Sequence, residues 1–196
     1  AYSLSPWGEG RGEGDPGRYT GAVVTLETLC RAASEGDLAR LEALPAKLEV
    51  LSGADSPLCF AAMYGQLAAA RLLLDRGAEV NHRGGYGRTP LLYAATKSAA
   101  LTKLVLERGA DLKARNDGGD DALEEHLVRS DAEPEVVDVL LAAGLDFRTP
   151  RTGYYAGRTH LMLAASCGRV DAMEKLLAAG ADPSYSPRRH NVLTSM

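Results

Sequence analysis

One apolar pattern recurs along this chain at a fixed spacing, and it restricts the fold more than any other feature. A first clear copy begins at Ser56 as SPLCFAAMYGQLAAARLLLDRGAEVN, and a second begins 33 residues later at Thr89 as TPLLYAATKSAALTKLVLERGADLKA. A third begins at Thr159 as THLMLAASCGRVDAMEKLLAAGADPS. A period of this length is typical of arrays in which each unit buries its apolar face against its neighbours.

The residues that recur in register have physical reasons for their places. Ser or Thr caps a helix, and Pro in the first turn loses no hydrogen bond, so Thr89-Pro90 predicts a helix start. Pairs such as Ala94-Ala95 allow helices to pack closely, and Gly65 favours the left-handed conformation that ends a helix. Each unit is therefore expected to form two short helices joined by a turn.

These copies resemble the ankyrin repeat in their Thr-Pro-Leu start, Ala-Ala pair, Leu-Leu pair and Gly-Ala end. Two degenerate copies, TLETLCRAASEGDLARLEALP and DALEEHLVRSDAEPEVVDVLLAAGLD, extend the series. The resemblance implies an all-α ankyrin-repeat solenoid of about five helix-turn-helix repeats with β-hairpin-like fingers. The predicted array covers residues 25–185, divided approximately into 25–53, 54–86, 87–118, 119–156 and 157–185, and residues 186–196 form a stub where a further repeat would begin.

The amino-terminal segment, residues 1–24, differs from the array. It contains SPWGEGRGEGDPGRYTG, which is rich in Gly, Pro and charge and buries little apolar area. We interpret it as an extended arm that is held either by the first repeat or by a partner chain, with Trp7 and Tyr19 as its anchors. Its GEGRGEG run lacks the flanking strand, helix and Lys-Ser/Thr of a phosphate-binding loop.

Composition and charge narrow the function classes. The formal net charge of −4 gives no sign of nucleic-acid or anionic-membrane binding, and no run of 18 apolar residues predicts a transmembrane helix. Three distant cysteines argue against a disulfide framework. We therefore expect an intracellular protein, either soluble or bound in a complex, in the cytosol or in an organelle after removal of a leader, because the chain does not begin with Met.

No spacing in the chain predicts catalysis, a metal site or a cofactor. The four histidines are at least 30 residues apart, so we expect them at the surface or at helix caps rather than as metal ligands or bases. The acidic run NDGGDD indicates a solvated turn rather than a calcium loop. Cys59 is expected to be a small buried residue and Cys167 to be exposed and more reactive.

The resemblance also implies where a partner would bind, on the surface formed by the fingers and the first helices. The expected helix positions are Met63, Tyr64, Thr96, Lys97, Val128, Arg129, Ser166 and Cys167. The expected finger positions are Arg83, Tyr86, Arg88, Arg115, Asp117, Asp120, Tyr154, Tyr155 and Arg158. Tyr and Arg are frequent binding anchors, and the arginines favour an acidic or carbonyl-rich partner.

These observations favour a non-catalytic protein-interaction module, acting as a structural or accessory subunit or scaffold in a larger assembly. One alternative is a free-standing inhibitory protein that binds an enzyme, as small ankyrin inhibitors of kinases do. A remote alternative is a ligand-binding or enzymatic site in the irregular fourth repeat, where Tyr154, Tyr155, His126 and Asp146 would supply the groups. We expect no bound nucleic acid, no membrane insertion and no homo-oligomer.

Overall fold

The computed structural model describes residues 20–43, 54–129, 133–150 and 157–186. Within these ranges all regular structure is helical, and no strand is present. The α-helices are α1 (Thr20–Glu35), α2 (Leu38–Ala43), α3 (Pro57–Met63), α4 (Leu67–Asp75), α5 (Pro90–Ala95), α6 (Ala99–Glu107), α7 (Ala122–Leu127), α8 (Glu135–Ala142), α9 (His160–Ser166) and α10 (Val170–Ala178). A short 3₁₀ turn, η1 (Gly85–Gly87), precedes α5.

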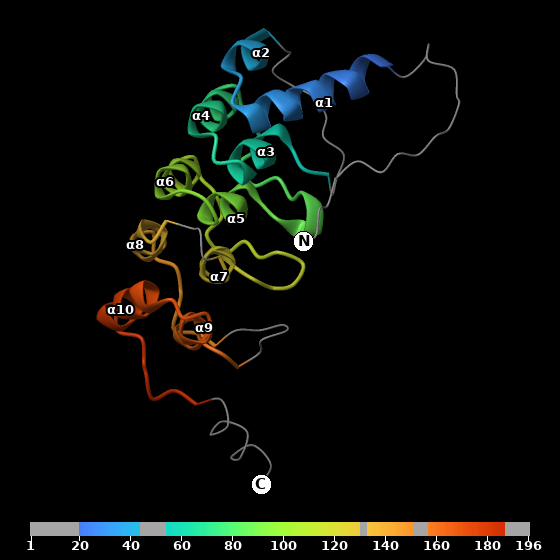
Figure 1. Cartoon of the computed structure of the whole chain (residues 1–196). Coiled ribbons are helices and arrows are strands. Elements are labelled where there is room, and N and C mark those ends of the chain that lie inside the picture. Colours follow the sequence, from blue (N-terminus) through green and yellow to red (C-terminus); the bar gives the residue numbers. More distant parts are fainter. Residues whose placement is uncertain (1–19, 44–53, 130–132, 151–156, 187–196) are drawn as a thin grey trace.

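The helices form two parallel layers that run the length of the array (Figure 1). The first helices α1, α3, α5, α7 and α9 pack on one another in chain order, and so do the second helices from α2 to α10. Loops between successive helix pairs project on the side of the first helices. The predicted all-α solenoid is confirmed, whereas α1 begins at Thr20, inside the segment predicted as an arm.

The fingers differ from the predicted hairpins. In the finger that carries RGGYGR, the Gly84 amide donates to the Arg88 carbonyl at 2.8 Å, and the residues between them form the η1 turn rather than paired strands. The expectation of a β-finger here is therefore wrong. A second finger closes in the same way, because the Asn116 amide donates to the Asp120 carbonyl at 2.9 Å.

Local sequence explains most helix boundaries. The Ser56 hydroxyl accepts from the Cys59 amide at 3.2 Å, and Thr159 caps α9 through the Met162 amide. Thr89 precedes Pro90 as predicted, but its side chain makes no capping hydrogen bond. Gly65 has φ +73°, which confirms the left-handed end predicted for α3.

Small residues set the spacing between repeats. Ala61, Ala62, Ala94 and Ala95 have no exposed surface, so neighbouring first helices approach at their Ala pairs. Leucines from each helix pair, such as Leu101, fill the space between the layers. No helix within the described ranges has both the length and the apolar run that a bilayer crossing requires.

Candidate protein-binding groove

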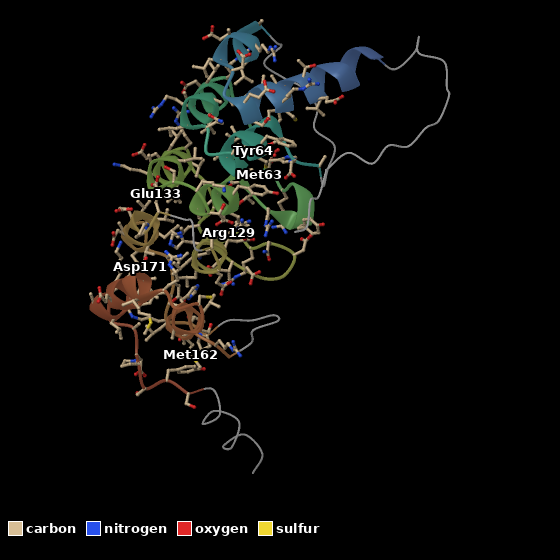
Figure 2. All side chains as sticks on the ribbon, in the orientation of Figure 1. Met63, Tyr64, Arg129, Glu133, Met162 and Asp171 are labelled. Carbon is tan, nitrogen blue, oxygen red and sulfur yellow. The ribbon has the colours of Figure 1, made fainter. Side chains whose placement is uncertain are left out.

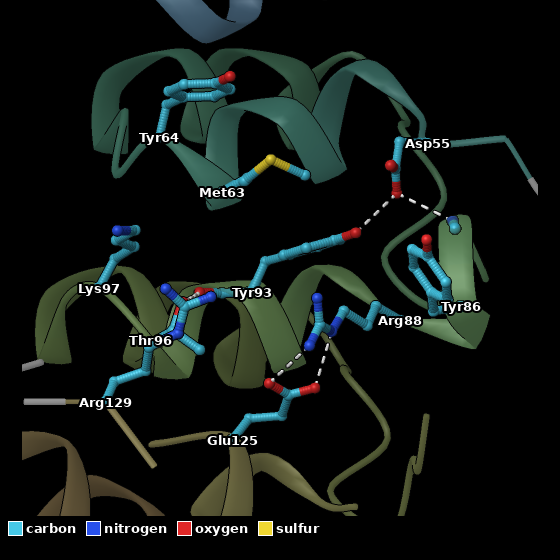
Figure 3. A pocket seen from close by; sticks show the side chains of 11 residues that line it. Asp55, Met63, Tyr64, Tyr86, Arg88, Tyr93, Thr96, Lys97, Glu125 and Arg129 are labelled. Atoms are coloured by element: carbon cyan, nitrogen blue, oxygen red, sulfur yellow. Dashed lines mark hydrogen bonds and ion pairs between the residues drawn. The ribbon is translucent and has the colours of Figure 1, made fainter. Parts of the chain in front are cut away.

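An open groove of about 500 Å³ lies where the finger before α5 meets the ends of α3, α5 and α7 (Figure 3). Seven residues that line it were predicted from the sequence: Met63, Tyr64, Tyr86, Arg88, Thr96, Lys97 and Arg129. Four more were not predicted: Asp55, Gly85, Tyr93 and Glu125. Figure 2 places Met63, Tyr64 and Arg129 at the ends of α3 and α7. The groove therefore brings three consecutive repeats to one surface.

The other predicted binding residues lie elsewhere. Eight of them do not line the groove: Arg83, Arg115, Asp117, Asp120, Val128, Arg158, Ser166 and Cys167. Trp7, Tyr19, Tyr154 and Tyr155 lie outside the described residues. Thr96 lines the groove but is only 5% exposed, since its hydroxyl donates to the Tyr93 carbonyl at 2.8 Å. Its expected exposure was wrong, because the hydroxyl bonds back into its own helix.

The wall nearest the finger is organised by Asp55. Its Oδ1 accepts from the Gly85 amide and from the Tyr93 hydroxyl, each at 3.1 Å (Figure 3). Burial, followed by the charge of Asp55, raises the pKa of Tyr93 well above its usual range. The hydroxyl therefore stays protonated and remains a donor. One carboxylate thus fixes both the finger backbone and the aromatic wall of the groove.

A bidentate ion pair forms the floor. Arg88 donates from Nε and Nη2 to the two oxygens of Glu125, at 2.7 and 3.1 Å. The Glu125 side chain is only 4% exposed and also accepts from the Asn116 amide nitrogen at 2.8 Å. The Arg88 guanidinium lies 5.8 Å from the centroid of the Tyr93 ring. This pair therefore joins the finger to α7 of the next repeat and desolvates both charges.

The other finger arginines are also occupied by the chain's own acceptors. Arg83 pairs with Asp117 at 3.2 Å and donates to the Arg115 carbonyl at 2.9 Å. Arg115 lies 3.4 Å from Asp121 and 3.6 Å from Glu124. The three arginines Arg83, Arg88 and Arg115 therefore tie neighbouring repeats together and are not an open basic surface for an acidic partner.

Tyr86, at the tip of the finger, has an unusual backbone. It is the one residue other than Gly with positive φ (56°) in the described part of the chain, and it is 82% exposed. Its carbonyl accepts from the Asp117 amide at 2.9 Å, while Gly85 is held by Asp55. The neighbouring Gly87 allows no side chain, because a Cβ would lie 2.1 Å from an oxygen of Asp117. The fold thus presents an aromatic ring to solvent at a position that favours Gly or Asn.

Comparison with known proteins decides the family. The model described as ankyrin repeats (3 copies) matches residues 29–116, and a single ankyrin repeat model matches residues 156–186. The chain belongs to the ankyrin-repeat family. The ankyrin resemblance predicted from the sequence is therefore confirmed. The degenerate fourth repeat falls largely between the two matches.

The curated relatives are much longer ankyrin-containing and related proteins. The ankyrin repeat protein nuc-2 of Neurospora crassa is 33% identical over 131 residues, covering 66% of this chain but 12% of nuc-2. XBOS33 of Oryza sativa subsp. japonica is 34% identical over 168 residues, covering 83% of this chain and 25% of XBOS33. The E3 ubiquitin-protein ligase XBAT33 of Arabidopsis thaliana is 37% identical over 84 residues, covering 40% of this chain and 16% of XBAT33. The chain thus spans a quarter or less of these three proteins.

Two histidines occupy core positions of the ankyrin pattern, which corrects the prediction of surface or capping roles. His126 replaces the first Ala of the Ala-Ala pair and has no exposed surface. Its Nδ1 lies 3.0 Å from the Ala95 carbonyl, and its Nε2 lies 3.1 Å from Arg169. Because burial lowers the pKa of His126, we assign the neutral ring, with Nδ1–H donating to Ala95 and Nε2 accepting from Arg169.

His160 takes the place of the ankyrin Pro at the start of α9 and is 1% exposed. Its Nε2 lies 3.0 Å from Oδ2 of Asp121, which caps α7 through the amides of Leu123 and Glu124. Burial opposes the charged forms, but the contact between the two groups outweighs it, so the pKa of His160 is raised and that of Asp121 is lowered. Asp121 was expected in a solvated turn; it is 2% exposed instead, because it serves two repeats at once.

The same cluster is the one group among the described residues with the donors for a metal ion. One ligand atom each from Asp121, Glu124 and His160 lies within 4.8 Å of the others. Arg115 contacts both carboxylates, so together with protonated His160 it balances their charge. The expected absence of a metal stays a prediction, and the cluster is explained as an ion-pair network.

The two histidines predict opposite responses to pH. His160 has a raised pKa when folded, so its contribution is complete below its unfolded pKa of about 6.5 and is lost as the pH rises through the folded value. The lowered pKa of Asp121 removes the same contribution below about pH 4. His126 has a lowered pKa, so its contribution is lost as the pH falls below about 6.5.

Urea unfolding between about pH 5 and 9 measures this difference. The stability lost in His160→Gln is expected to shrink as the pH rises, and the loss in His126→Gln is expected to grow. Each variant is the control for the other, because both remove a buried imidazole. Slopes of the same sign would contradict the assigned charge states.

The cysteines are found where they were expected. Burial raises the pKa of Cys59 to about 11, and that of Cys30 to about 12, so neither is a ready nucleophile. Cys167, at the end of α9, is exposed as predicted.

Proposed function

We propose that this chain is a non-catalytic interaction module whose groove binds a segment of another protein, and that it serves as a structural or accessory subunit or scaffold. The groove itself carries the proposal, because its floor is rigid and its rim is apolar. Asp55 and the Arg88–Glu125 pair are satisfied within the chain. Tyr64 and Tyr86 are 55% and 82% exposed around this fixed floor.

Exposed aromatics around a preformed groove favour a binding surface over a surface that only confers solubility. A rigid groove also lowers the entropy lost on binding. The relatives support a role within larger units, since the matching region is 12% of nuc-2 and 25% of XBOS33. We further propose that protein, rather than nucleic acid or a second copy, is the partner, in keeping with the net charge of −4.

Site-specific photocrosslinking in cells tests this proposal. A photoreactive phenylalanine at Tyr64 is expected to capture a defined partner, whereas the same group at Arg71, exposed on α4 in the other helix layer, is not. Excess unlabelled wild type should abolish the crosslink, and excess Tyr86→Gly should not. Equal capture from Arg71, or equal competition by both proteins, would contradict binding in the groove.

A further inference from the structure

The groove is electrically polarised from end to end. The charges of Arg88 and Glu125 cancel within their bidentate pair. In Figure 3, Asp55 lies at one end beside Tyr86, and Lys97 and Arg129 lie at the opposite end. A bound segment therefore meets cationic groups at the end away from the finger.

The groups at this end follow the repeat. Tyr64, Lys97 and Arg129 each lie eight residues after the N-cap of their repeat's first helix, namely Ser56, Thr89 and Asp121. They consequently form a ladder along the array with one rung per repeat, in the order aromatic, cation, cation. Packed helices lie about 8–10 Å apart, which sets the spacing of the rungs.

The size of the groove favours an extended occupant over a helix. Three first helices span about 20 Å, so about 500 Å³ corresponds to a mean cross-section of about 25 Å². A helix of about 10 Å diameter needs about 80 Å². An extended strand advances about 3.3 Å per residue, so one rung of the ladder corresponds to about three residues.

We propose that the groove binds an extended protein segment carrying an apolar side chain for Tyr64 and Met63, and carboxylates three and six residues away for Lys97 and Arg129. The inference rests on the proposed function and adds the chemistry of the partner. The expected pattern is apolar-x-x-acidic-x-x-acidic, read in either chain direction. Opposite charges at these rungs give specificity, and like charges are repelled.

Selection from a random peptide library displayed on phage tests the pattern with the full chain as bait. Wild type is expected to enrich peptides with this spacing, and the best peptide should bind at least tenfold more weakly to the double variant Lys97→Glu, Arg129→Glu. Its affinity should also fall as salt rises. The matched control is Lys103→Glu with Lys113→Glu, which reverses two exposed lysines that do not line the groove and should leave binding unchanged.

Three other outcomes would overturn the inference. Peptides that depend on Tyr64 but show no acidic enrichment and bind the charge-reversed variant normally would refute the ladder while leaving the proposed function intact. Peptides that ignore both Tyr64 and the charge reversal would refute the two together. Displacement of the selected peptides by random single-stranded DNA at physiological salt would identify the cationic end as a nucleic-acid site instead.

Discussion

Arg88→Ala is expected to lower the free energy of unfolding by about 3 kcal/mol, because it leaves a buried carboxylate without its cation. Glu125 is 4% exposed and would keep only the Asn116 amide as a neutral partner. Small domains have only about 5–15 kcal/mol of total stability, so this is a large loss. Chemical denaturation followed by circular dichroism measures it.

Arg83→Ala is the matched control, since it removes an ion pair from the same finger. Both partners of that pair are mostly exposed, at 54% and 67%, and its loss should cost less than about 1 kcal/mol. Replacing both buried partners, as Arg88→Met with Glu125→Leu, should recover most of the stability. Equal losses from Arg88→Ala and Arg83→Ala would show that Glu125 is not stabilised by its pair.

The fold was predictable because the repeat is written in local sequence. Caps such as Ser56, small pairs such as Ala61-Ala62 and helix ends such as Gly65 act within a few residues of their own positions. Seven groove residues followed from register alone, since each repeat places the same positions on the same side. What can be read from period and capping was therefore read correctly.

The polar interior was not predictable in the same way. Asp55 bonds Tyr93 across 38 positions and Arg88 bonds Glu125 across 37, so each pairing spans two repeats and leaves no local pattern. The one usable signal was substitution at a core position of the repeat. A His in an Ala place, as at His126, or in a Pro place, as at His160, requires buried partners, and that requirement was overlooked.

Tyr86→Gly is expected to separate stability from binding, with effects of opposite sign. The left-handed backbone at Tyr86 costs about 1–2 kcal/mol for a residue with a side chain, and Gly removes that cost. The greater freedom of Gly in the unfolded chain offsets about 0.5–1 kcal/mol of the gain. The free energy of unfolding should therefore stay level or rise by up to about 1 kcal/mol, measured by urea unfolding.

Affinity for the partner, or for a peptide selected on the groove, should fall at least tenfold in Tyr86→Gly, because an exposed aromatic anchor is lost. Tyr86→Phe is the control, since it keeps the ring and the strained backbone and should change neither quantity by much. A residue retained for folding alone would give the reverse, a less stable variant with unchanged affinity. At 82% exposure the Tyr86 ring has little to lose within the chain, so backbone strain that persists there without packing is best explained by contact with another protein.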